Sequence, residues 1–98
     1  GQKDYEQAAY YLGKYLQLAP DDTKARKLLG RTYMLMGQHN EAQAVLKPGL
    51  QDGDDSELLA LIGLSQIQAG DIASGISGLQ KALQVTPESK ELRGELVK

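Results

Sequence analysis

The sequence predicts an all-α fold in which short helices pair into antiparallel hairpins and the hairpins stack on one another. Two observations lead to this prediction: an internal repeat of 33 to 34 residues, and apolar residues spaced three and four apart within each repeat. A third is the absence of any run with the alternating pattern typical of β-strands. The predicted architecture is therefore a single helical-repeat domain.

The repeat appears when the sequence is aligned with itself. An offset of 33 residues superimposes Gly30 on Gly63, Gly37 on Gly70, Leu46 on Leu79 and Leu50 on Leu83. An offset of 34 residues superimposes Ala8 on Ala42, Leu12 on Leu46 and Leu16 on Leu50. Because the matching residues are small or apolar, the repeat reflects helix packing rather than chance.

The apolar spacing predicts helices joined by tight turns, at residues 4–18, 23–36, 39–51, 56–69, 72–85 and 88–98. Gly37 and Gly70 are expected to end helices in the left-handed backbone conformation. Asp54, three residues before Glu57, is expected to cap a helix. Pro48 lies within the predicted helix 39–51 and should kink or end it, because proline lacks a backbone donor.

Small residues occupy the places where paired helices should approach closely. Gly30 and Gly63 are predicted to lie against Ala42 and Gly75, since a side chain there would push the helices apart. Gly75 and Gly78 should together cost about 2 kcal/mol relative to Ala if both are helical and exposed. This predicts that the second complete repeat is the softer one.

The combination of Leu-Gly, a Tyr three residues later, a turn Gly, an Ala and a closing Pro resembles the tetratricopeptide (TPR) repeat over essentially the whole chain. The resemblance implies a right-handed superhelical solenoid with no enzymatic activity and a role in protein–protein interaction. It divides the single domain into four segments. Residues 1–22 form the second helix of a partial repeat, 23–55 and 56–89 are full repeats, and 90–98 form the first helix of a further repeat or a capping helix. Arg26 and Gln66 depart from the family pattern, which has a large apolar residue and an aromatic residue at these positions.

A finer resemblance concerns the segments YLQLAPDDTKARKLLGRTYM, AVLKPGL and LLALIGLSQIQAGD. They are similar to TPR lipoproteins of bacterial PEP-CTERM/exosortase and exopolysaccharide systems, which carry long repeat arrays outside the cytoplasm. This resemblance implies a periplasmic or outer-membrane-associated scaffold, of which the chain would be an internal fragment since it has no Cys for lipid attachment. Without it, a cytoplasmic location is expected.

In the family, the first helix of each repeat lines an inner, concave surface, so the resemblance predicts a groove that binds a partner segment. The candidate groove residues are Lys24, Lys27, Arg31, Glu57, Leu61, Leu64, Gln68 and Glu91. Lys24, Lys27 and Arg31 share one helix face, either as a basic stripe that grips a carboxylate or as a solvated face. The predicted helix 56–69 has apolar residues on nearly all sides, although a single layer of stacked hairpins leaves one side of each helix uncovered. Leu61 and Leu64 are expected on that open side, where they would contact a ligand, neighbouring repeats or a second copy.

Composition argues against other functions. The chain has no Cys and one His, which excludes a disulfide framework, a thiolate zinc site and a Cys nucleophile. With 11 Lys+Arg against 13 Asp+Glu, the net charge of −2 argues against binding to RNA. His39 has no nucleophile or metal partner at motif spacing, and the acidic run 52–57 lacks the glycine of a calcium loop. No catalytic residue, cofactor or metal is expected.

The expected partner is a protein or peptide segment, with no nucleic acid and no membrane insertion. The alternative is a structural spacer, or a repeat segment that associates with other copies through exposed end helices. Tyr11 and Tyr15, one turn apart on the first predicted helix, are expected to cover the next hairpin or a preceding repeat that is missing from this sequence, and not to stack on nucleotides.

Overall fold

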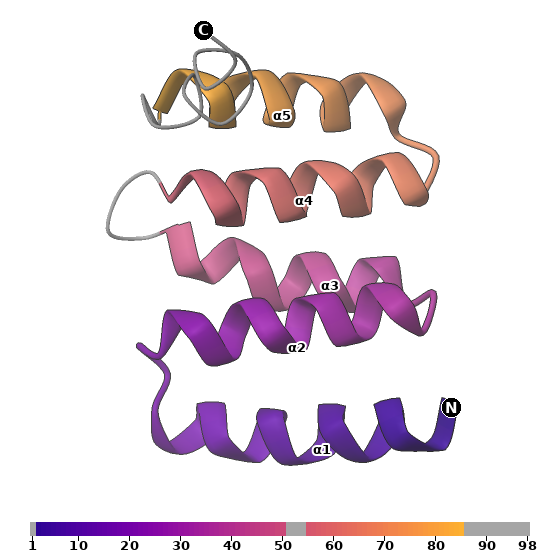
Figure 1. Ribbon diagram of the computed structural model, residues 1–98, viewed down its shortest axis with the longest axis vertical. Coiled ribbons are helices and arrows are strands. Elements are labelled where there is room, and N and C mark those ends of the chain that lie inside the picture. Colours follow the sequence, from indigo (N-terminus) through magenta and orange to yellow (C-terminus); the bar gives the residue numbers. More distant parts are fainter. Residues whose placement is uncertain (1, 51–54, 86–98) are drawn as a thin grey trace, which may run out of the picture.

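The computed structural model describes residues 2–50 and 55–85, and every regular element within them is helical. The elements are α1 (Gln2–Leu18), α2 (Thr23–Leu35), α3 (His39–Leu46), the 3₁₀ turn η1 (Lys47–Leu50), α4 (Ser56–Gln68) and α5 (Ile72–Val85). Successive helices run in opposite directions and lie one above another from α1 to α5 (Figure 1). The all-α prediction is confirmed for the described residues, whereas the predicted helix 88–98 lies outside them.

Glycine turns close the two complete hairpins, α2–α3 and α4–α5. Gly37 has φ +77° and Gly70 has φ +99°, as predicted for residues that end a helix in the left-handed region. At the first turn, the Gly37 N–H donates to the Met34 carbonyl (3.0 Å) and the Gln38 N–H donates to the Tyr33 carbonyl (2.8 Å). These bonds satisfy carbonyls that the end of α2 would otherwise leave unpaired.

Capping side chains and proline explain where these helices begin and end, with one correction to the predictions. The Asp55 carboxylate accepts the N–H groups of Glu57 (3.0 Å) and Leu58 (3.2 Å), so Asp55 caps α4. The prediction of Asp54 as the cap was wrong by one residue, because α4 begins at Ser56 and a cap must immediately precede its helix. Pro48 acts as predicted: α3 ends at Leu46 and the chain tightens into η1.

The buried apolar core lies between neighbouring helices of the stack. One cluster of buried residues joins α3 to α4 and consists of Ala42, Leu46, Leu58, Leu61 and Ile62. A second joins α1 to α2 and consists of Ala9, Leu16, Ala25 and Leu29. Tyr33 packs against both clusters, so the apolar interior continues from one hairpin to the next.

Close helix approach within the hairpins depends on glycine; the predicted pairing of Gly63 with Gly75 is confirmed, whereas the side chain nearest to Gly30 is Leu46 and not Ala42. A Cβ at Gly30 would lie 2.5 Å from Leu46 Cδ2, and a Cβ at Gly75 would lie 2.5 Å from the Gly63 carbonyl oxygen. Gly75 is buried against α4, so the propensity cost that applies to an exposed helical glycine does not describe it. A Cβ at Gly78 would make only an ordinary contact, 3.4 Å from Gly63 Cα.

Arg26, which departs from the family pattern, replaces an apolar contact with two hydrogen bonds. Its Nη1 donates to the Val45 carbonyl (2.9 Å) and its Nη2 to the Pro20 carbonyl (2.7 Å). The side chain therefore fastens the α1–α2 turn to the end of α3.

Among the described residues, none of the helices has both the length and the apolar character that a bilayer span requires.

Candidate partner-binding face

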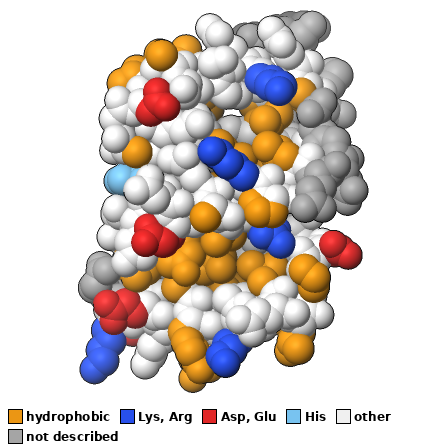
Figure 2. Space-filling model, turned by 180° about the vertical axis from the view of Figure 1, so that it is seen from behind, with side chains coloured by type: hydrophobic (Ala, Val, Ile, Leu, Met, Phe, Trp, Pro, Cys, Tyr) orange, Lys and Arg blue, Asp and Glu red, His pale blue; other side chains and the backbone are white. Residues whose placement is uncertain are grey.

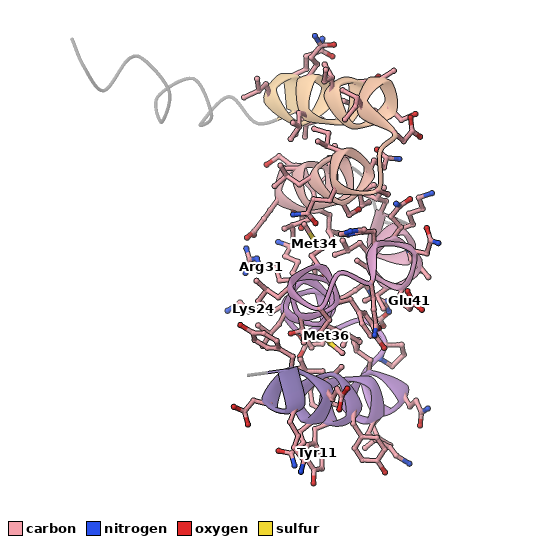
Figure 3. All side chains as sticks on the ribbon, turned by 90° about the vertical axis from the view of Figure 1, so that its right-hand side faces the viewer. Tyr11, Lys24, Arg31, Met34, Met36 and Glu41 are labelled. Carbon is pink, nitrogen blue, oxygen red and sulfur yellow. The ribbon has the colours of Figure 1, made fainter. Side chains whose placement is uncertain are left out.

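Helices α2 and α4 present one continuous surface, on the side from which Lys24 and Arg31 project and away from Glu41 of α3 (Figure 3). We call it the α2–α4 face and define it by its exposed residues: Lys24, Leu28, Arg31, Leu35, Glu57, Leu64 and Gln68. The α2 members recur at intervals of four, three and four residues, which aligns them on one side of the helix. Three of the seven are leucines that are 43–65% exposed.

An ionic network crosses this face from α2 to α4. Lys27 Nζ lies 2.9 Å from Glu57 Oε1 and 3.0 Å from Asp55 Oδ2, and Arg31 pairs with the other oxygen of Glu57. The Lys27 side chain is only 15% exposed. The network joins the first helices of successive hairpins and holds their spacing.

The charges of the network stabilise one another. Burial disfavours the charged form of Lys27, but hydrogen bonds to Glu57 and Asp55 outweigh it and raise the Lys27 pKa. The bond from Lys27 lowers the Glu57 pKa below its usual range. For Asp55, burial opposes ionisation, yet Lys27 and backbone N–H groups prevail and lower its pKa. Much of the positive charge of the predicted basic stripe is therefore paired with Asp55 and Glu57 of the same chain. Lys24 and the part of the Arg31 guanidinium that does not contact Glu57 remain for a partner.

A hollow of about 230 Å³ opens on the same face, lined by Arg31, Met34, Leu35 and Gln68. Two of the four, Arg31 and Gln68, are among the groove residues predicted from the sequence. Arg31 contacts Glu57 through Nη2, and its side chain is 48% exposed. The hollow thus combines an aliphatic wall from Met34 and Leu35 with hydrogen-bonding groups at its rim.

The structure contradicts the expected exposure of Leu61, which is only 7% exposed and belongs to the α3–α4 cluster. The reason is that α4 lies between the α2–α3 hairpin and α5, which together cover most of its apolar circumference. Leu64, on the remaining open arc, is 43% exposed as expected. Glu91 lies outside the described residues.

Three apolar residues of this surface and its hollow, Leu28, Met34 and Leu35, are not among the groove residues predicted from the sequence. A signal for two of them was available: Leu28 and Leu35 follow Lys24 and Arg31 by four residues each. Exposed apolar residues alone would not have been decisive, because apolar side chains also gather on the opposite side of the molecule (Figure 2). The α2–α4 face is distinguished by having a hollow and charged groups beside its leucines.

Other sites offer less chemistry. His39 begins α3 and lines a hollow of about 360 Å³ with the glycine turn, and its Nδ1 is buried without a hydrogen-bond partner within the described structure. In residues 2–50 and 55–85, no group of three His, Asp or Glu side chains is placed to hold a metal ion. Another hollow, of about 410 Å³, lies where the start of α4 meets the end of α5 and is lined mainly by Ala and Leu.

The family model described as the tetratricopeptide repeat matches residues 1–64, which is 64 of the 98 residues. No curated protein matches the sequence. The matched segment spans α1, the α2–α3 hairpin and most of α4, which includes the greater part of the α2–α4 face. The chain therefore belongs to the tetratricopeptide repeat family.

Proposed function

We propose that this chain is a non-enzymatic protein–protein interaction module that binds a segment of a partner protein along the α2–α4 face. TPR repeats generally mediate protein–protein interactions, and in this proposal the α2–α4 face is the concave groove of a longer right-handed repeat scaffold. The observation that carries the proposal is the hollow between Arg31, Met34, Leu35 and Gln68, flanked by exposed Leu28 and Leu64. Such a site suits an aliphatic side chain of the partner next to a carbonyl or carboxylate oxygen.

The leucines supply the driving force. Burying a whole leucine side chain stabilises a complex by about 1.5–3 kcal/mol, so covering the exposed half of Leu28, Leu35 and Leu64 contributes roughly 0.75–1.5 kcal/mol each. Their sum, about 2–4.5 kcal/mol, reaches only the lower end of the free-energy cost of associating two molecules, which is about 4–15 kcal/mol. Binding therefore also needs polar contacts, and Arg31 and Gln68 at the rim of the hollow can provide them.

The ionic network contributes by preorganisation. Since Lys27, Asp55 and Glu57 hold α2 and α4 together in the unbound chain, the partner does not have to pay the cost of arranging the two helices. The same neutralisation argues against a site that depends on gripping a terminal carboxylate with several free cations. Shape and aliphatic contact dominate, with Arg31 giving orientation.

The test uses peptides selected from a phage-displayed random library on the 98-residue chain, with binding measured by fluorescence anisotropy. Leu35→Lys should weaken binding of the selected peptides at least tenfold. Leu18→Lys is the matched control, because Leu18 is also the last residue of a helix, is 87% exposed and lies outside the α2–α4 face. Equal affinity of both variants for every selected peptide, with helical circular dichroism retained, would favour the structural-spacer alternative.

A further inference from the structure

Arg31 lies between an ion pair and the hollow of the α2–α4 face. Its Nη2 donates to Glu57, and its side chain lines the hollow together with Met34, Leu35 and Gln68. Within the described part of the chain, the bond to Glu57 is the one hydrogen bond that this side chain makes, and the side chain is 48% exposed. A guanidinium carries five N–H donors in a planar fork, so donors remain on Arg31 for a bound segment.

The charges around Arg31 favour an acidic partner. The α2–α4 face and its ionic network together contain the cations Lys24, Lys27 and Arg31 and the carboxylates Asp55 and Glu57. This region therefore has a surplus of positive charge, although the whole chain has a net charge of −2. A positive region on an acidic chain attracts carboxylates and repels other cations.

Of the three cations, Arg31 is the best placed to bind a carboxylate beside the hollow. Lys27 is only 15% exposed and is already paired with two carboxylates of this chain. Lys24 precedes Arg31 by nearly two turns of α2, about 10 Å along the helix axis, so one carboxylate cannot contact both. A segment that places an aliphatic side chain in the hollow can therefore set a neighbouring acidic side chain on Arg31.

Glu57 already occupies part of the site that such a carboxylate would use. One of its oxygens contacts Arg31 and the other contacts Lys27, and its side chain is 50% exposed. Hydrogen bonds from Lys27 and Arg31 lower the Glu57 pKa, so Glu57 is charged at neutral pH and repels a second carboxylate. Lys27 does not depend on Glu57 alone, because Asp55 Oδ2 lies 3.0 Å from Lys27 Nζ.

We propose that the partner segment carries an Asp or Glu side chain next to the aliphatic residue that enters the hollow, and that Glu57 competes with this carboxylate for Arg31. The inference rests on the proposed function, because it names the chemistry of the segment that binds the α2–α4 face. In the complex, the partner's carboxylate forms charge-assisted hydrogen bonds with Arg31, while the Lys27–Asp55 pair keeps α2 and α4 together. Glu57 thereby sets the affinity for acidic segments and leaves the affinity for neutral segments unchanged.

The test extends the phage-display selection on the 98-residue chain, with affinities measured by fluorescence anisotropy. Each selected peptide is also synthesised with its acidic residues replaced in turn by the matching amide. One of these replacements should weaken binding about tenfold, which is the effect of losing a charge-assisted hydrogen bond. Arg31→Gln should abolish the difference between the acidic and the amide peptide, whereas Lys24→Gln should leave the difference within about twofold of its wild-type value.

A matched pair of variants tests the role of Glu57. Glu57→Gln should bind the acidic peptide about three- to tenfold more tightly than the wild type does, and the amide peptide within about twofold, because it removes a like charge beside Arg31. Glu41→Gln is the control, since it makes the same change at an exposed glutamate of α3, away from the α2–α4 face (Figure 3). It should bind both peptides as the wild type does. Glutamine favours helices, so the fold should survive in both variants, and circular dichroism checks it.

Two results would overturn this inference alone. The first is a set of peptides that contain no acidic residue, or that bind equally well after every amide replacement. The second is a Glu57→Gln variant that binds the acidic peptide no more tightly than Glu41→Gln does. In both cases the peptides still bind the α2–α4 face, and the proposed function stands. A selection that yields no peptide sensitive to Leu35→Lys would instead refute the proposed function, and this inference with it.

Discussion

Two glycines one turn apart in α5 should respond to alanine with opposite signs. Gly75→Ala places a Cβ 2.5 Å from the Gly63 carbonyl oxygen and also against the Ile67 side chain. Because the first of these atoms belongs to the backbone of α4, relief requires the two helices to separate. Gly78→Ala places its Cβ 3.4 Å from Gly63 Cα, at ordinary contact distance.

The magnitudes follow from two competing effects. Both substitutions gain about 1 kcal/mol of helix propensity. Overpacking against a facing backbone costs about 2–3 kcal/mol, so Gly75→Ala should lower the free energy of unfolding by about 1–2 kcal/mol and Tm by roughly 5–15 °C. Gly78→Ala should raise the free energy of unfolding by about 0.5–1 kcal/mol.

Urea denaturation followed by circular dichroism measures both variants on the same chain. The slope of the free energy against urea concentration should stay unchanged, which shows that the two variants unfold the same surface. If Gly75→Ala stabilises the chain as much as Gly78→Ala does, then α4 and α5 do not approach as closely as described, and the hairpin geometry argued above is wrong.

Three further predictions concern stability. Lys27→Met should cost about 1–2 kcal/mol at pH 7, because it leaves two neighbouring carboxylates without their shared cation. Because the pKa of Glu57 is lowered in the folded state, Glu57 stabilises the fold above its ordinary pKa of 4.5, and this stabilisation is lost as the pH falls below that value. Urea unfolding should therefore show a smaller destabilisation by Lys27→Met at pH 3 than at pH 7. The same destabilisation at both pH values would contradict the ionic network. Arg26→Met should cost about 1–2 kcal/mol, because two backbone carbonyls lose their donor, and a change within about 0.3 kcal/mol would show that these hydrogen bonds contribute nothing. Gly37→Ala should lower the free energy of unfolding by about 1 kcal/mol, because Gly37 has a positive φ. Gly13→Ala should raise it by about 0.5–1 kcal/mol, because a Cβ at Gly13 meets open space. Thermal melts that rank the two variants in the reverse order would refute the turn geometry.

Local features of the fold could be predicted because they depend on single residues. The left-handed turns depend on Gly37 and Gly70, and the end of α3 depends on Pro48, so the sequence was sufficient for both. The cap of α4 was misplaced by one residue because Asp54 and Asp55 are adjacent and either could precede a helix. Helix boundaries are the least certain part of any such prediction, since neighbouring residues have similar capping chemistry.

The candidate site was harder to predict because it depends on contacts between helices. Hydrophobic spacing indicates that α4 is apolar on nearly all sides, but it does not indicate which arc its neighbours cover, so Leu61 was expected at the surface and lies in the core. Helical spacing correctly aligns the cations of α2, but it does not show that Asp55 and Glu57 of the next repeat reach back to Lys27. Such pairings between repeats require the distance between helices, which a single sequence does not contain.

The proposed function requires that a partner segment lie along the α2–α4 face. The most direct measurement is an amide chemical-shift titration of the 98-residue chain with a peptide selected from the random library. If the partner segment binds there, the largest shifts should fall on Leu28 to Leu35 of α2 and on Leu64 to Gln68 of α4, with α1 little changed. Shifts confined to α1 or α5, with α2 and α4 unaffected, would contradict it.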